Sequence, residues 1–189
     1  MIKHLSLLRL PRVFQRFARD HRAIAAVEFA LLLPLMVTLY LGGVEISQGI
    51  GADRKVTLTA RSVADLASRV TKITDADMSN ILNAGTAVMA PYSSAKLKVT
   101  LSEVTIDATG KATITWVDKY NGGTSPNRSV GDTVTLPSAL NVPSTSLIWA
   151  EVSYDYKPVI GYVITGQLTL KDQMYMRPRL SDSVTRTAT

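Results

Sequence analysis

The residue with the clearest chemical consequence is Glu28, the one ionisable side chain in an apolar run of about twenty residues that follows Arg22. Such a run is long enough to cross a bilayer as a helix. A carboxylate in hydrocarbon costs several kcal/mol unless it is paired or neutralised. The residues leave two interpretations open. Glu28 reaches the interface or Arg22, or it meets a cationic group of a partner helix and fixes the register between the two helices.

The distribution of His and Cys restricts the chemistry available after the apolar run. The chain has no Cys, and both of its His residues, His4 and His21, precede the run. Nucleophile–histidine catalysis, disulfides, and metal sites with thiolate or imidazole ligands are therefore excluded beyond it. A hydrolase would have to use Asp, Glu, Ser, Lys or Tyr, and no pair of acids stands out at a strand end. We predict no enzymatic activity, no cofactor and no metal.

Two weaker patterns favour ordinary structure over a binding site. Asp118, Asp132 and the glycines at 122–123 do not have the spacing of a calcium-binding loop of the EF type. Four aromatic residues fall on predicted strands without clustered Lys or Arg, which favours packing over a nucleic-acid platform. They are Trp116, Trp149, Tyr154 and Tyr156.

The positive charge of the chain is local. Residues 1–22 hold six of the 21 Lys and Arg residues but only one of the 15 acids, so the net charge of +6 lies almost entirely there. This location argues against a nucleic-acid partner. The positive-inside rule places residues 1–22 in the cytoplasm and the part after residue 44 on the far side of the membrane. The basic segment is either an amphipathic helix on the inner leaflet or a poorly ordered tail.

The segments that position Glu28 are a leader at 1–22, a transmembrane helix at 23–44 that contains Pro34, and an exported domain at 45–189. The run is longer than the apolar part of a signal peptide and no A-x-A pattern follows it at once, which favours a retained helix. Apolar residues then recur at steps of three and four, so we expect the helix to continue to residue 73. These residues are Val56, Ala60, Val63, Ala67, Val70 and Ile73.

The remaining chain predicts a second helix and a small antiparallel sheet. Thr74 or Asp75 can cap a helix that ends at residues 90–91. Alternating residues predict strands at 97–106, with a bulge at 102–103, and at 112–120, 147–157 and 167–176. We expect a hairpin turn at 107–111, a long loop at 121–146, a partly helical connection at 158–166 and a polar tail at 177–189. The fold class is therefore α+β, with one long N-terminal helix on the sheet.

Residues 22–34 read RAIAAVEFALLLP, which resembles the N-terminal motif of TadE-like proteins, minor pseudopilins of the Tad (Flp, type IVc) pilus system. In that family a basic leader ends in Gly and is followed by A-x-x-V-E-F-A and an apolar helix with Pro. The resemblance extends through 52–71 and returns at 175–179. It implies a pilin-like fold and cleavage by a prepilin peptidase between Ala23 and Ile24. Ala23 stands where the family has Gly, which leaves open whether the leader is removed.

The resemblance also implies a function and a place for this chain. It implies an inner-membrane protein with a single span, a cytoplasmic N-terminus and a periplasmic domain, whose partners are other pilin-like proteins and Tad assembly proteins. Glu28, Phe29 and Pro34 would set helix register during assembly. Arg177 and Arg179 would contact a partner, or they simply form the charged end of a strand. The alternative function is a membrane-anchored periplasmic binding or adhesion domain unrelated to pili.

Overall fold

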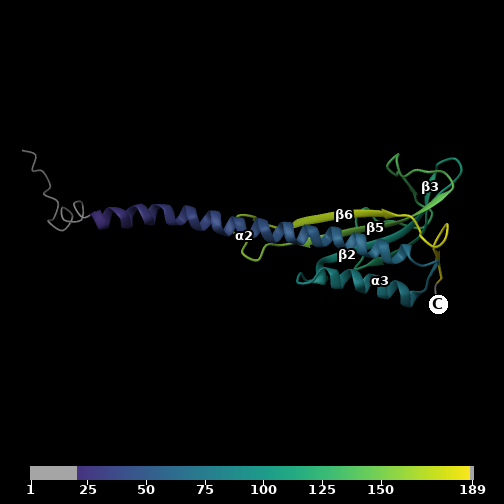
Figure 1. Ribbon diagram of the computed structural model, residues 1–189, viewed down its shortest axis with the longest axis horizontal. Coiled ribbons are helices and arrows are strands. Elements are labelled where there is room, and N and C mark those ends of the chain that lie inside the picture. Colours follow the sequence, from purple (N-terminus) through teal and green to yellow (C-terminus); the bar gives the residue numbers. More distant parts are fainter. Residues whose placement is uncertain (1–20, 188–189) are drawn as a thin grey trace, which may run out of the picture.

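One helix of 48 residues, α2 (His21–Ser68), is the axis of the molecule (Figure 1). The computed structural model describes residues 21–187, so the predicted leader segment at 1–20 lies outside the described residues. The first half of α2 extends away from the rest of the protein, and the second half lies along a sheet and a second helix, α3. Pro34 lies within the helix and does not end it. Pro34 supplies no N–H to the helix, and its carbonyl accepts a hydrogen bond from the Thr38 hydroxyl.

The second half of α2 carries the predicted apolar stripe, and its small residues are fully buried. The expected continuation to residue 73 was wrong, because α2 ends at Ser68. Lys72–Ile73 instead forms a short strand, β1, that pairs in parallel with β7 (Thr185–Arg186). The Ser68 carbonyl, left free at the helix end, accepts a hydrogen bond from the Arg179 backbone N–H.

Helix α3 (Asp75–Val88) begins at a capping box. Thr74 and Asp77 exchange side-chain-to-backbone hydrogen bonds, as the predicted cap requires. The helix packs on α2 where Gly85 lies against Val63, and a Cβ at Gly85 would lie 2.7 Å from Val63 Cγ2. The absence of a side chain at Gly85 therefore sets how closely the two helices approach.

Five strands form an antiparallel sheet in the order β4-β3-β2-β5-β6, which confirms the α+β class. The chain enters it through a short 3-10 turn, η1 (Ser94–Lys96). The predicted bulge is present, as a register shift between Glu103 and Val104 in the pairing of β2 with β3. The strands are β2 (Leu97–Ile106), β3 (Ala112–Tyr120), β4 (Thr133–Val134), β5 (Thr145–Tyr156) and β6 (Leu168–Met176).

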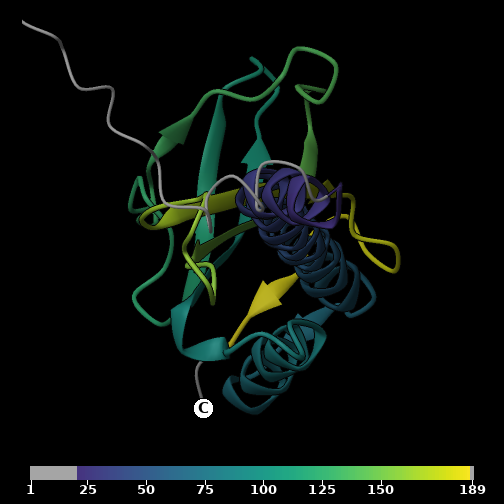
Figure 2. The same ribbon diagram turned by 90° about the vertical axis from the view of Figure 1, so that its left-hand side faces the viewer.

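The two faces of the sheet are covered differently. Helix α2 packs on β5 and β6, and α3 packs on α2 (Figure 2). A second apolar cluster lies around Ile114 and Trp149 and includes Leu136 from the predicted long loop. Nearly every residue of β5 is buried, so this strand is covered on both faces.

Two predictions for the C-terminal half were wrong. The connection at 158–166 is not helical, because the N–H groups of residues 162–164 bind a side chain of α2 instead of their own carbonyls. Residues 177–187 are not a simple polar tail, since Val184 is fully buried and β7 pairs with β1.

Candidate assembly interface

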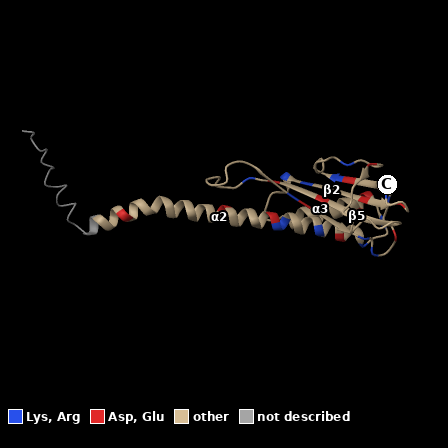
Figure 3. Cartoon of the chain, turned by 90° about the horizontal axis from the view of Figure 1, so that it is seen from above, with Lys and Arg blue, Asp and Glu red and all other residues tan. Residues whose placement is uncertain are grey.

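The largest uncovered apolar surface belongs to residues 24–44, the apolar half of α2. Large apolar side chains there are exposed all around the helix, from Ile24 to Tyr40. Figure 3 shows Lys, Arg, Asp and Glu concentrated on the other half of the molecule, while the first half of α2 is almost free of charge. A helix that is apolar on every side is stable in water only if something covers it. Lipid or other apolar helices are the natural cover.

Glu28 and Phe29 are both exposed on this half. Glu28 makes no hydrogen bond or ion pair with any side chain that the structure describes. The Ala23–Ile24 peptide bond lies in the first turn of α2, where backbone N–H groups lack partners within the helix. Glu28 is therefore available to a group from outside the chain.

Glu45 is a buried acid that the sequence patterns did not single out. It lies one residue beyond the apolar half, and its side chain is fully buried under the β5–β6 loop (residues 157–167). Its carboxylate accepts three backbone hydrogen bonds, from Tyr162 at 2.6 Å, Val163 at 3.0 Å and Ile164 at 2.8 Å. These donors, Ile164 foremost, hold the pKa of Glu45 below its usual value.

One signal could have identified Glu45. It lies seven residues before Ala52 and thus on the same face as the buried stripe of α2. An acid that extends a buried apolar stripe needs hydrogen-bond donors within the fold. The donors here are backbone N–H groups, the first of them 117 residues away in sequence. No local pattern identifies those donors.

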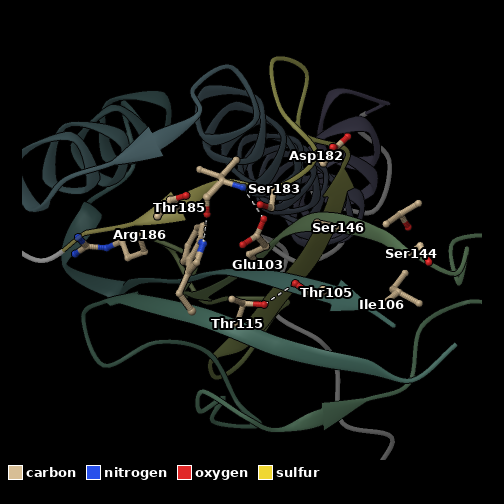
Figure 4. Close-up of a pocket in the computed structure, with 13 residues that line it drawn as sticks. Glu103, Thr105, Ile106, Thr115, Ser144, Ser146, Asp182, Ser183, Thr185 and Arg186 are labelled. Atoms are coloured by element: carbon tan, nitrogen blue, oxygen red, sulfur yellow. Dashed lines mark hydrogen bonds between the residues drawn. The ribbon is translucent and has the colours of Figure 1, made fainter. Parts of the chain in front are cut away.

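A second buried acid, Glu103, lies beneath the C-terminal segment. It borders an open depression of about 520 Å³ whose labelled side chains come from β2, β3, β5, Ser144 just before β5, and the C-terminal residues (Figure 4). Glu103 Oε1 accepts a hydrogen bond from the Val184 N–H at 2.7 Å, and Trp116 Nε1 donates to the Val184 carbonyl at 2.7 Å. Burial raises the pKa of Glu103, although the Val184 N–H opposes that rise.

Arg186 completes the attachment of this segment. Its guanidinium binds Asp118 on β3 through two nitrogens, at 2.9 and 3.2 Å, and also binds Asp75 at the start of α3. Hydrogen bonding to Asp118 is the main cause that raises the pKa of Arg186. The residues around the depression thus serve to join the C-terminal segment to the sheet and to α3.

The two arginines of the predicted partner contact have different surroundings. Arg179 forms an ion pair with Asp65 of α2 at 2.6 Å, and Asp65 also pairs with Arg69 at 2.5 Å. Arg177 is exposed and has no charged partner among the described residues. Arg179 therefore has an internal contact, while Arg177 remains free to meet another protein.

The patterns that suggested calcium and aromatic platforms have structural explanations. Asp118 binds Arg186, and Asp132 accepts the Ser129 N–H at 2.8 Å. No cluster of three or more His, Asp or Glu suited to a metal ion occurs within residues 21–187. The four aromatic residues are buried, which confirms their predicted packing role: Trp116, Trp149, Tyr154 and Tyr156.

These features define a class: an α+β domain carried by one N-terminal helix that is long and apolar enough to span a membrane, consistent with a membrane-anchored protein. The family model described as TadE-like protein matches residues 23–65, and the predicted resemblance is confirmed over that segment. It contains the apolar half of α2 and most of the packed half. Neither a curated protein nor a solved structure matches the chain.

Proposed function

We propose that this chain is a minor pseudopilin or assembly component of a Tad-type pilus. Residues 23–44 cross the inner membrane, residues 1–22 lie in the cytoplasm and residues 45–189 form a periplasmic domain. One observation supports this proposal: the segment that matches the family model, residues 23–65, includes the whole uncovered apolar half of α2. That half exposes large apolar side chains over about five turns of helix, a composition that demands a continuous apolar cover.

Glu28 has a specific task in this proposal. A carboxylate in the bilayer costs several kcal/mol unless a positive group neutralises it. No described side chain of the same molecule does so. An N-terminal ammonium or an Arg of a neighbouring pilin-like helix would satisfy Glu28 at one stagger of the two helices only. Phe29 and Pro34 flank the contact, Phe29 as an exposed apolar surface and Pro34 as a site where the helix lacks one hydrogen bond.

Co-purification from detergent-solubilised membranes tests this task. We expect Glu28→Ala to lose most of the pilin-like partners that the wild-type chain retains, because the helices lose their one fixed charge contact. Asp53→Ala is the matched control, since Asp53 is an exposed acid on the same helix beyond the apolar half. Retention of the partners by Glu28→Ala at the wild-type level would refute the register role.

Processing by a prepilin peptidase is a separate part of the proposal. The mass of the intact membrane-extracted protein distinguishes loss of residues 1–23 from retention of the leader. Because Ala23 replaces the family's Gly, Ala23→Gly should increase the cleaved fraction if the peptidase reads this position. If neither the wild-type protein nor Ala23→Gly loses the mass of residues 1–23, the chain keeps its leader and is a single-span membrane component.

Association rather than catalysis is the work we assign to the exported domain, with Arg177 as a surface contact for other Tad assembly proteins. The genes beside this one provide an independent check. A secretion ATPase and a prepilin peptidase gene are expected there. Their absence, together with intact membrane anchoring, would favour an envelope binding or adhesion domain instead.

A further inference from the structure

The β5–β6 loop lies beside α2 at the point where the apolar half ends (Figure 1). Its backbone binds Glu45, and Val163 lies against Gly42, where a Cβ would lie 3.1 Å from Val163 Cγ2. These contacts place the loop at the level of residues 42–45. A membrane spanned by residues 23–44 would therefore have its surface at this loop.

The loop exposes an unusual set of side chains for this position. Val159 is 88% exposed and Tyr162 is 58% exposed, and Ile160 and Val163 are exposed between and beside them. No charged residue occurs from 158 to 170. Ile46 and Ile50, one turn apart, continue the exposed apolar surface of α2, whereas Val130 and Leu180 are exposed singly in other parts of the exported domain. Four such residues within five positions make a continuous patch, which marks an interaction surface.

Part of the loop backbone has its hydrogen-bond partners within the protein. An unpaired N–H group costs several kcal/mol in hydrocarbon, which keeps most irregular loops out of membranes. Here Glu45 binds the N–H groups of residues 162–164, so these three groups have partners without water. Tyr is a residue that settles at the boundary between headgroups and acyl chains.

We propose that residues 159–163 form a second membrane contact, with Val159 and Ile160 inserted among the lipids of the leaflet from which α2 emerges. This proposal rests on the membrane span of α2 proposed above. With two points of contact, the exported domain has a fixed orientation on the bilayer instead of swivelling about its helix. The occupant is lipid, because the patch is continuous with the apolar half of α2 and lacks the charges expected at a polar protein interface.

Lipid quenching of single-cysteine variants tests the contact, and the absence of native Cys removes background labelling. The full chain is reconstituted in liposomes of phosphatidylcholine and phosphatidylglycerol and labelled with a polarity-sensitive fluorophore. Val159→Cys reports on the loop and Leu35→Cys on the apolar half of α2. Val130→Cys is the matched control, because Val130 is 64% exposed beside Gly131, which bonds to Ile114 in the half of β3 remote from the loop.

Lipids brominated in the acyl chain should quench the probes at 159 and 35 at least several-fold more than the probe at 130. Quenching at 35 with water-like behaviour at 159 would overturn the loop contact while leaving the anchor intact. A blue-shifted but unquenched probe at 159 would show a protein occupant, such as a second copy, and would also overturn it. An unquenched probe at 35 would refute the membrane span and with it the loop contact.

Discussion

Replacing Glu103 tests the attachment of the C-terminal segment to the sheet. Glu103→Met keeps the approximate size of the side chain but removes the acceptor for the buried Val184 N–H. Leaving a buried donor without a partner costs about 1–3 kcal/mol. Glu103→Gln retains an amide oxygen at that place and removes a carboxylate that burial makes unfavourable. We therefore expect Gln to be at least as stable as wild type at neutral pH, and Met to be less stable by about 1–3 kcal/mol.

The pH dependence follows from the direction of the pKa shift. Because the folded protein raises the pKa of Glu103 above its ordinary value of 4.5, the folded state holds this proton more tightly than the unfolded state. Its contribution to stability is fully present below that ordinary value and is lost as the pH rises through the folded pKa. The stability difference between wild type and Glu103→Gln should therefore shift in favour of Gln as the pH rises above 4.5.

Urea unfolding of the detergent-solubilised chain, followed by tryptophan fluorescence, measures these differences. The two tryptophans, Trp116 and Trp149, are both buried in the sheet and report on the exported domain. Equal destabilisation by Gln and Met at neutral pH would contradict the assignment of the Val184 N–H to Glu103. A difference between wild type and Gln that does not change with pH would contradict the raised pKa.

Three other perturbations test separate contacts. Glu45→Ala should speed hydrogen exchange at residues 162–164, measured by mass spectrometry, because their N–H groups lose their acceptor; unchanged exchange would show that the loop is held otherwise. Gly85→Ala gains about 1 kcal/mol of helix propensity but forces Val63 to move at a cost of about 1–3 kcal/mol. The midpoint of thermal unfolding of this variant should therefore fall or stay level, and it should rise again when Val63→Ala is added. Arg179→Ala should change unfolding by at most about 1 kcal/mol, since the pair is on the surface; a larger loss would give it a structural role.

The elements that the sequence predicted well are those whose pattern is local. Apolar residues at steps of three and four identified the packed half of α2, and alternation identified β3 with its observed ends at Ala112 and Tyr120. The capping box at Thr74 and the bulge after Glu103 also depend on neighbouring residues alone. At the candidate interface, the motif at 22–34 was the clearest part of the resemblance, which the family match confirms over residues 23–65, because an acid in an apolar run is visible without a fold.

The elements that the sequence missed depend on distant partners. Val184 is a lone apolar residue in a polar stretch, and its burial requires Trp116 and Glu103 from two other strands. The end of α2 at Ser68 also could not be predicted, since the apolar stripe continues to Ile73 and only pairing with residues 185–186 draws the chain out of the helix. The β5–β6 loop became significant only when the fold placed it beside Gly42.

The short parallel pairing of β1 with β7 has a consequence for biogenesis. Residues 72–73 leave the ribosome more than one hundred residues before their partners at 185–186. Until residues 184–186 are synthesised, Trp116 Nε1 lacks the carbonyl of Val184 and Asp118 lacks Arg186. A chain that stops before residue 184 would therefore contain every residue of α2 and of the five-stranded sheet but would lack the segment that binds Trp116 and Glu103. Closure of this part of the fold therefore requires that synthesis has passed residue 186.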